Sequence, residues 1–317
     1  MIIMLEGPDL AGKTTLAKKL KKFVKGSTVV HRGPPELPDP FGEYLTPLEE
    51  MYHSDGSFIL DRWHWGERVY GPIVRKKDMF SNPSFEYLEM ACERYGVYRV
   101  LRLPSVATLR QRWDEHGDDF IDASQHVDVI DAYTSMKRGS GGVTVDRMLE
   151  MDDVNKTVAA RVVSEAFFRE RCSRHLDCWT SYIGPYTPKV LFVGEAPAAT
   201  RRGNHTTAFT PYRGSSGEYL MYALGAVNFK RTVGTFGFCN ALTESQGKLD
   251  TLIDQLDEPR VVALGAVAHD ELTDIDRHHG RIPHPQFARR FHNREFVSYG
   301  SALVRAAQGE DMRTWRG

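Results

Sequence analysis

Short apolar runs alternate with amphipathic segments along the first half of the chain. Each run is rich in β-branched or aromatic residues, which is typical of buried strands. The runs span residues 2–5, 28–31, 58–61 and 98–103. Segments with apolar residues at helical spacing lie between or after them, at residues 15–25, 85–94 and 106–113. This alternation predicts a parallel α/β sheet that binds its ligands at the carboxyl ends of the strands.

The pattern changes after about residue 145. Residues 155–172 predict one helix, and residues 178–188 form an aromatic and proline-rich stretch typical of a linker. Strand patterns resume at residues 189–194, 237–242 and 260–265. We therefore predict a first α/β domain at residues 1–150, a helix and linker at 151–188, and a smaller α/β domain at 189–317.

Residues 7–14 read Gly-Pro-Asp-Leu-Ala-Gly-Lys-Thr and follow the first predicted strand directly. This is the pattern G-x-x-x-x-G-K-[ST], whose glycines let backbone N–H groups converge on phosphate oxygens. Lys13 reaches the β- and γ-phosphates, and the Thr14 hydroxyl faces Mg²⁺. The sequence thus predicts a site for ATP and Mg²⁺ in front of a helix N-terminus. The residues predicted to hold the nucleotide are Gly7, Gly12, Lys13, Thr14 and Thr15.

Two charged residues end the third predicted strand. Asp61 is placed to hold Mg²⁺ or its water, and the Arg62 guanidinium can bind a phosphate with two N–H groups. A salt bridge at the strand end is the alternative. Residues 63–71 gather aromatic rings that either stack on a base or form a local core. Further on, Arg110 and Arg112 either belong to a lid over the phosphoryl groups or mark a solvated helix end.

These features together resemble the thymidylate-kinase branch of nucleotide kinases over roughly residues 1–140. The resemblance implies a P-loop kinase domain that transfers the γ-phosphate of ATP, with Mg²⁺, to a pyrimidine deoxynucleotide. By position, Asp9 and Arg62 face the acceptor, and Arg32 matches a family arginine only approximately. The predicted catalytic residues are Lys13, Asp9, Asp61, Arg62, Arg110 and Arg112, and the predicted metal ligands are Thr14 and Asp61.

A second series of motifs lies in the last part of the chain. They are Gly-Glu-Ala-Pro at 194–197, Gly-Ser-Ser-Gly at 214–217, Asn240, Ala-Leu-Gly at 263–265 and His-Pro at 284–285. In this order they resemble the uracil-DNA glycosylase superfamily, whose compact α/β domains flip a nucleotide out of DNA and cleave its glycosidic bond with an activated water. By position, Glu195 belongs to the water-activating turn, Asn240 reads the base edge, and His284 stabilises the departing base.

Cysteine usage argues against a metal cluster in this part. Ala198 stands where the related branch has glycine, and the four cysteine ligands of that branch are not reproduced. No iron–sulfur cluster is therefore predicted. Cys92, Cys172, Cys178 and Cys239 are scattered without C-x-x-C spacing, which fits reduced thiols. No apolar stretch reaches the length of a membrane span and the first strand starts at once, so we expect no signal peptide and a cytoplasmic protein.

The chain has 41 basic and 42 acidic residues and a net charge of −1. The chain as a whole therefore lacks the excess of positive charge that is typical of nucleic-acid-binding proteins. Residues 277–294 differ, with five arginines, four histidines and no acidic residue. This run is predicted to bind a DNA backbone through Arg289 and Arg290, and a solvated basic face is the alternative.

The two resemblances together indicate a kinase for a thymidine-like group, fused to a glycosylase-like domain that binds DNA. The acceptor is either a free deoxynucleoside monophosphate such as thymidylate or 5-hydroxymethyluracil within DNA. The fused domain favours the second, because a base in a duplex must be extruded before a kinase reaches it. Kinases of this second kind serve base hypermodification in bacterial viruses, so a phage origin is suspected. A uracil-DNA glycosylase with a regulatory nucleotide-binding half is the competing interpretation.

Overall fold

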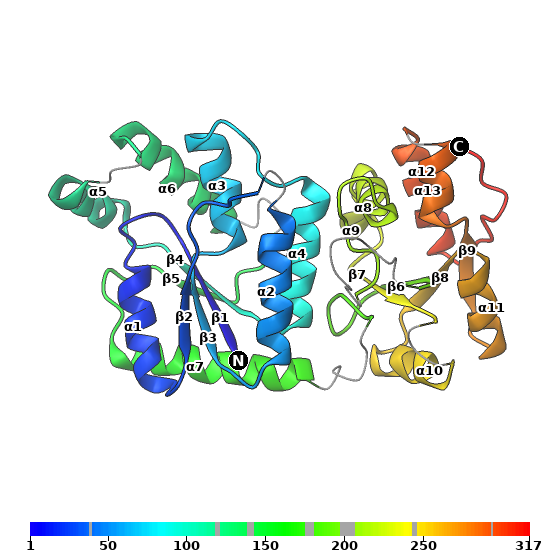
Figure 1. Cartoon of the computed structure of the whole chain (residues 1–317), viewed down its shortest axis with the longest axis horizontal. Helices are drawn as coiled ribbons and strands as arrows, with labels where there is room; N and C mark the ends of the chain where they lie inside the picture. Colours follow the sequence, from blue (N-terminus) through cyan, green and yellow to red (C-terminus); the bar gives the residue numbers. More distant parts are fainter. Residues whose placement is uncertain are drawn as a thin grey trace. The chain divides into compact units, whose positions relative to one another are not determined.

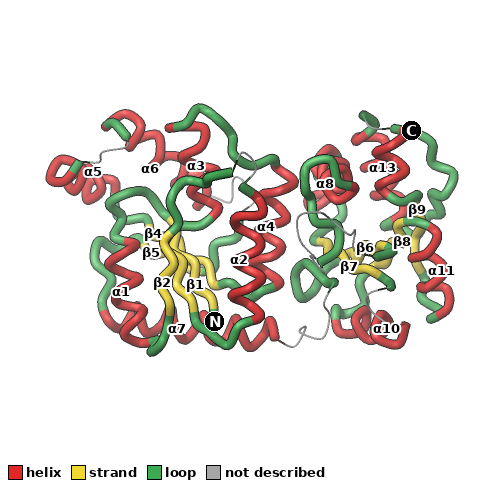
Figure 2. The backbone as a smooth tube through the Cα atoms, in the orientation of Figure 1, coloured by secondary structure: helices red, strands yellow, loops and turns green. Residues whose placement is uncertain are grey.

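The computed structural model describes residues 1–37, 40–117, 121–137, 143–174, 181–196, 207–242, 246–292 and 294–317. The chain divides into two compact units (Figure 1). The first comprises Met1–Ser81 and Tyr95–His175, and the second comprises Asn82–Arg94 and Leu176–Gly317. Each unit is built on its own parallel sheet, drawn in yellow in Figure 2. The mixed α/β class expected from the sequence is therefore present in both units.

The sheet of the first unit has the strand order β2-β3-β1-β4-β5, with every neighbouring pair parallel. Its strands are β1 (Ile2–Glu6), β2 (Thr28–His31), β3 (Phe58–Asp61), β4 (Tyr98–Arg102) and β5 (Arg147–Leu149). In this register Asp61 lies opposite both Leu5 and His31. The carboxyl ends of β1, β2 and β3 are therefore level, and the residues that follow them meet at one edge of the sheet.

Among the described residues of the first unit, six helices surround this sheet. They are α1 (Lys13–Phe23), α2 (Phe41–His53), α3 (His64–Val74), α5 (Val106–His116), α6 (Ala123–Lys137) and α7 (Lys156–Arg174). The sheet face that carries Ile3 and Leu5 forms one core cluster with Leu16 and Leu20 of α1 and with Val162 of α7. Burial of these side chains, at about 25 cal/mol for each Å² of apolar surface, fixes α1 against the sheet. The start of α1 is thereby held next to β1.

The sheet of the second unit has the order β7-β6-β8-β9, again parallel throughout. Its strands are β6 (Val190–Gly194), β7 (Phe236–Asn240), β8 (Arg260–Leu264) and β9 (His279–Ile282). Its helices are α4 (Asn82–Arg94), α8 (Ser216–Ala226), α9 (Phe229–Thr232), α10 (Gln246–Gln255), α11 (Ala266–Asp274), α12 (Pro285–Phe291) and α13 (Phe296–Ala306). Of the three residues assigned by the glycosylase resemblance, Asn240 ends β7, Glu195 follows β6 directly, and His284 lies in the turn after β9.

Two helices belong to other units than the predicted domain boundaries indicate. Helix α7, predicted as a connecting segment, is part of the first unit. Helix α4 is counted with the second unit although it precedes β4 in the chain. The Tyr87 hydroxyl donates to the carbonyl of Ala208 (2.8 Å) and Arg94 Nε donates to the carbonyl of Tyr182 (3.3 Å). These two hydrogen bonds attach α4 to segments more than 80 residues away.

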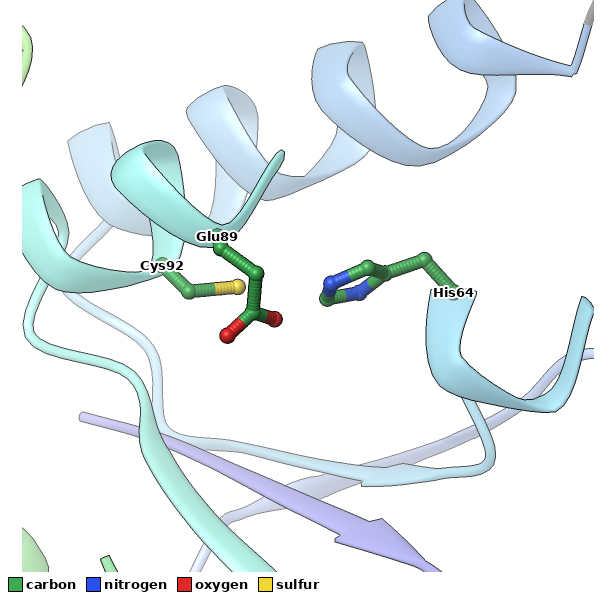
Figure 3. Close-up of side chains that lie close together, drawn as sticks. All are labelled: His64, Glu89 and Cys92. Carbon is green, nitrogen blue, oxygen red and sulfur yellow. The ribbon is translucent and has the colours of Figure 1, made fainter. Parts of the chain in front are cut away.

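Figure 3 shows two further side chains of α4, Glu89 and Cys92. They are three residues apart and leave the helix on the same face, and both are buried. His64, the first residue of α3, is drawn in the same figure and belongs to the first unit. Glutamate is rarely buried in proteins. Glu89 therefore differs from the apolar residues whose helical spacing predicted this helix.

The strand β9 was not predicted from the sequence. Its four residues, His-Gly-Arg-Ile, were read as part of a basic run, yet Gly280 and Ile282 alternate inward and are buried. A Cβ atom on Gly280 would lie 1.9 Å from the carbonyl oxygen of Ala306, so only glycine fits there. The basic run therefore spans a strand, the turn before α12, and α12 itself. Within the described residues, no helix is long and apolar enough to cross a membrane.

Candidate functional site

The loop between β1 and α1 has the backbone of a phosphate-binding turn. Gly7 has φ 142° and Gly12 has φ 84°, conformations that L-residues rarely adopt. A Cβ atom on Gly7 would lie 2.1 Å from the carbonyl oxygen of Arg102 in β4. Leu10 also has positive φ, at 62°. The glycine at position 7 is thus required twice, by the backbone conformation and by the close approach of β4.

Lys13 is buried at the start of α1, and its ammonium group points back into the loop. Its Nζ donates to the carbonyl of Gly7 (2.8 Å) and to that of Pro8 (2.6 Å). These two hydrogen bonds hold the ammonium group against the inner side of the loop. A phosphate bound by the backbone N–H groups of the loop would meet this charge at short range.

Thr14 and Asp61 form the predicted pair at the sheet edge. The Thr14 hydroxyl donates to Asp61 Oδ2 at 2.6 Å, and His31 Nδ1 lies 3.6 Å from the same oxygen. Asp61 Oδ1 is buried and accepts no hydrogen bond from any described residue. A hydroxyl and an unsatisfied carboxylate oxygen are ligands that Mg²⁺ prefers, so these two residues fit the predicted metal site.

Asp9 and Arg62 meet on the other side of the loop. The Arg62 guanidinium forms an ion pair with Asp9 and lies over the ring of Tyr70, 5.6 Å from its centroid. The Tyr70 hydroxyl donates to Asp9 Oδ2 (2.7 Å), and the Asp9 backbone N–H donates to that hydroxyl (3.0 Å). Arg62 has φ 71°, which costs of order 1–3 kcal/mol in a non-glycine residue. Backbone strain of this kind is concentrated at functional sites.

One cavity of about 380 Å³ is lined by the groups of the two pairs and by the start of α1: Asp9, Gly12, Lys13, Thr14, Asp61 and Arg62. Arg112 of α5 also lines it, and its guanidinium donates to the carbonyls of Leu10 (2.9 Å) and Asp152 (3.1 Å). Arg110 is exposed and is not among the lining residues, so the structure separates the two arginines predicted for the lid. Residues 118–120, at the end of that predicted lid, lie outside the described part of the chain.

Arg102 and Tyr70 are site residues that sequence reasoning missed. Arg102 ends β4, lines the cavity, and donates to the carbonyls of Leu149 (2.8 Å) and Asp152 (2.6 Å). Burial, and secondarily the charge of Arg112, lower the pKa of Arg102 to about 10. Its position at a strand end was the one signal available. Tyr70 lies within the aromatic stretch 63–71, which offered no reason to prefer it over its neighbours.

The aromatic stretch after β3 is mostly core. Trp63 and Trp65 are 1% and 0% exposed and do not line the cavity. The buried Glu6 carboxyl accepts from the Trp63 backbone N–H (2.7 Å) and from the Tyr133 hydroxyl (3.2 Å). Burial raises the pKa of Glu6 above its ordinary value. Residues 63–71 were expected either to stack on a base or to form a local core. Trp63 and Trp65 form a local core.

The second unit has its own cluster of polar and aromatic groups at the sheet edge. Asn240 ends β7 and is 2% exposed, and its Nδ2 has no hydrogen-bond partner among the described residues. A Cβ atom on Gly194 would lie 2.5 Å from the Phe209 ring and 3.0 Å from Asn240 Oδ1. The ring centroid of Phe209 lies 5.8 Å from that of His284. Gly194 thus allows an unsatisfied amide and a ring to lie side by side.

His284 caps α12 and is held in one tautomer. Its Nδ1 accepts the Gln286 backbone N–H at 3.1 Å, which leaves the proton of the neutral ring on Nε2. Burial lowers the pKa of His284 to about 4. The imidazole is therefore neutral at physiological pH and can donate one hydrogen bond from Nε2. Glu195, directly after β6, is exposed, and Pro197 and Ala198 lie outside the described residues, as does Cys178.

The predicted basic run is only partly available for anions. Arg277 forms ion pairs with Asp250 and Asp254 from α10, so its charge is compensated. Arg289 and Arg290 both lie on α12, where Arg289 is half-buried and Arg290 is exposed. Arg277 therefore contributes no uncompensated positive charge to this run.

Comparisons with known proteins give matches over the first half of the chain. No family model matches the sequence. The prophage-derived protein YorR of Bacillus subtilis (strain 168) is 24% identical over 146 residues, which are 44% of this chain and 84% of that protein. The structure of YorR in complex with phosphorylated GDP covers 55% of this chain and 98% of that chain, with 18% identity and a TM-score of 0.43. Deoxyadenosine kinase from M. mycoides with bound dATP covers 53% of this chain and all of its own, with 14% identity and a TM-score of 0.32.

The fold and the first site define a mixed α/β protein with a phosphate-binding loop between β1 and α1 of its first unit. Its structural neighbours in that half are YorR and deoxyadenosine kinase.

Proposed function

We propose that the first unit is an ATP- and Mg²⁺-dependent phosphotransferase acting on a thymidine-like pyrimidine deoxynucleotide. One observation carries the proposal. Lys13, the Thr14–Asp61 pair and the Asp9–Arg62 pair line the same cavity of about 380 Å³. A phosphate-binding loop alone needs neither Asp61 nor the Asp9–Arg62 pair, whereas a kinase needs donor, metal and acceptor contacts within reach of one another.

Each group has a distinct part in the transfer. The loop N–H groups and Lys13 bind the β- and γ-phosphates, and Thr14 and Asp61 would hold Mg²⁺, which would neutralise charge on the phosphates. Arg62 binds an anionic group of the acceptor. An acceptor hydroxyl gives its proton to Asp9 as its oxygen bonds to the γ-phosphorus, and the bond from that phosphorus to the β,γ-bridging oxygen of ATP breaks, which releases ADP.

We favour 5-hydroxymethyluracil within DNA as the acceptor, with a free monophosphate such as thymidylate as the alternative. A hydroxymethyl group must lose a proton during the transfer, and the Asp9 carboxylate, which contacts Arg62 and the Tyr70 hydroxyl, is the base we assign to it. A free monophosphate presents an oxygen that is already anionic, so it needs orientation rather than a base. The oriented carboxylate supports the first acceptor.

One assay of phosphate transfer tests both the kinase activity and the choice of acceptor. Radiolabelled ATP is offered with dTMP, dUMP, hydroxymethyl-dUMP and hydroxymethyluracil-containing DNA. Asp9→Asn is expected to lower transfer to the hydroxymethyl group by about 10²-fold or more, the usual contribution of a general base, while transfer to a monophosphate oxygen falls less. Label on none of the acceptors contradicts the kinase, and label on dTMP alone contradicts the DNA acceptor.

A second candidate function concerns the second unit, which we propose binds a pyrimidine base of DNA in the cluster of Asn240, Phe209 and His284. The buried Nδ2 of Asn240 has no partner among the described residues, which supports this, because such a group is costly unless a ligand satisfies it. In the kinase interpretation this unit presents the base. In the competing interpretation it cleaves uracil from DNA and the first unit regulates it.

Uracil excision from single-stranded DNA separates these two interpretations. No excision, together with weaker DNA binding by Asn240→Ala, is expected if the second unit only presents the base. Excision that Asn240→Ala and His284→Ala abolish would favour the glycosylase.

A further inference from the structure

Two histidines meet at the edge of the second sheet. His269 lies on α11, and His279 is the first residue of β9, the strand at one end of the order β7-β6-β8-β9 (Figure 1). Both residues are half-buried. The Nδ1 atom of His269 lies 2.7 Å from Nε2 of His279, and the two ring planes are inclined at 63°. Two imidazole nitrogens from separate elements are therefore directed at each other.

A second hydrogen bond fixes the tautomer of His279. Its Nδ1 atom lies 2.6 Å from the carbonyl oxygen of Arg277. A carbonyl oxygen only accepts, so this Nδ1 carries a proton, and Nε2 of the neutral ring keeps its lone pair. Histidines that bind metal ions are oriented in the same way, with the ring nitrogen that does not bind the metal donating to a backbone carbonyl or a carboxylate. His279 thus presents Nε2 toward His269 as a metal ligand would.

Both histidines are carried by firmly packed parts of the second unit. Ala268 and Leu272 of α11 are buried in one core cluster with Val261 of β8. On β9, a Cβ atom on Gly280 would lie 1.9 Å from the carbonyl oxygen of Ala306, so the strand lies tightly against the end of α13. The two imidazoles are therefore held close together before any ligand arrives, which lowers the entropy cost of binding.

The charges around the pair balance one another. Three charged side chains act electrostatically on His269, namely Asp270 beside it on α11, Arg281 on β9 and Asp311 near the end of the chain. Asp311 also forms an ion pair with Arg313 (3.0 Å). Two carboxylates and two guanidinium groups are thus present, and a divalent cation meets no net positive charge from these four groups.

We propose that His269 and His279 bind a divalent transition-metal ion through Nδ1 and Nε2 respectively, with Zn²⁺ as the preferred ion. Imidazole nitrogen suits zinc, copper and nickel, whereas Mg²⁺ takes oxygen ligands. Zn–N bonds of about 2.0–2.1 Å in a tetrahedral shell place two ligand nitrogens about 3.3 Å apart, so the 2.7 Å separation must widen by about 0.6 Å. The proton on Nδ1 of His269 moves to Nε2 of the same ring, which stays neutral.

The remaining coordination positions fall to water. In the part of the chain that the structure describes, no aspartate, glutamate, cysteine or further histidine joins the pair closely enough to be a third ligand. A bound ion would link α11 to β9 in the folded chain alone, so it would stabilise the second unit. The proposal goes beyond the transfer reaction and requires neither unit to be catalytic.

Titration of Zn²⁺ into the full chain, followed by calorimetry in excess Mg²⁺, tests this. The Mg²⁺ occupies oxygen sites such as the one proposed in the first unit. His269→Gln and His279→Gln are each expected to weaken Zn²⁺ binding at least about tenfold, because even an outer-shell partner of a ligand is worth 10–100-fold. Glutamine keeps a hydrogen-bonding side chain at each position but offers no imidazole nitrogen. His278→Gln is the matched control, since His278 is the exposed neighbour of His279 and should not affect binding.

Two further measurements do not rely on the titration alone. Zn²⁺ should raise the thermal unfolding midpoint of the unchanged chain and of His278→Gln, and should raise that of His269→Gln and His279→Gln less. Co²⁺ bound to the unchanged chain should show the visible absorption of a nitrogen-ligated ion, and Zn²⁺ should displace it. The absorption needs no variant, so it remains decisive if a glutamine variant fails to fold.

The outcomes separate the proposal from its competitors. Loss of binding in both His269→Gln and His279→Gln, with binding kept in His278→Gln, supports it. The absence of saturable Zn²⁺ and Co²⁺ binding refutes it and leaves the pair as a hydrogen bond between α11 and β9. Binding that survives both glutamine changes, or that Mg²⁺ displaces, also refutes it, since the ion then has other ligands. Phosphate transfer measured with Mg²⁺ alone does not depend on this pair, so failure of the kinase proposal remains distinguishable.

Discussion

Replacing Gly7 by alanine tests how far the geometry of the phosphate loop controls binding. The added Cβ would lie 2.1 Å from the Arg102 carbonyl oxygen, whereas ordinary contact begins at 3.4 Å, so the loop and β4 must separate by about 1.3 Å. The φ of 142° adds of order 1–3 kcal/mol of backbone strain for any residue other than glycine. A displacement of about 1 Å in a positioning element costs roughly 10²-fold in rate.

The expected result of Gly7→Ala is therefore two separate losses. Stability falls by about 1–3 kcal/mol in denaturant unfolding, and kcat/KM for phosphate transfer falls about 10²-fold. The thermal stabilisation given by Mg²⁺ and ADP should shrink in parallel. Gly26→Ala is the matched control, because Gly26 also has positive φ (78°) but nothing lies within 4 Å of its Cβ position. That variant should lose stability only. Wild-type kcat/KM and nucleotide stabilisation in Gly7→Ala would refute the argument from close approach.

The remaining predictions use the same measurements. Lys13→Ala should abolish transfer and leave the unfolding transition in place, and activity within about tenfold of wild type would contradict the role given to its ammonium group. Arg62→Ala should raise the acceptor KM with ATP affinity nearly unchanged, and an equal loss of ATP binding would move Arg62 to the donor side. Because the pKa of His284 is lowered from 6.5 to about 4, the unfolded chain binds more protons between these values, so stability should rise with pH across that window and fall on acidification. In His284→Asn, which retains a cap for α12, urea unfolding should show a flatter pH dependence, and an unchanged slope would count against the burial of this imidazole.

The sequence predicted those parts of the site whose placement depends on local chain geometry. The glycines at positions 7 and 12 impose the loop on the segment between strand and helix, so Lys13 and Thr14 follow from spacing alone. Asp61 follows because neighbouring parallel strands bring their carboxyl ends to one edge. These groups are close in space because they are close in sequence or lie on predictable strands.

Other features depended on contacts between distant segments. Tyr70 contributes because it faces Asp9 across 61 residues, and no local pattern distinguishes it from Trp63 or Trp65. The charge of Arg277 is compensated by Asp250 and Asp254 of another helix, a pairing that the run of basic residues does not indicate. Strand β9 was not predicted because it has only two buried residues, Gly280 and Ile282. An alternation of buried and exposed positions over four residues is too short to indicate a strand.

The position of α4 has a consequence for how the chain can be divided. Residues 82–94 are made early in synthesis, yet their hydrogen bonds go to Tyr182 and Ala208, which are made much later. The hydrogen bond between Tyr87 and Ala208 therefore cannot form until 121 further residues have been made. No single cut yields both units intact, because a cut near residue 175 removes the acceptors of Tyr87 and Arg94 from one product and α4 from the other. Recombination that exchanged the two halves between proteins would have to carry this inserted helix with the later half.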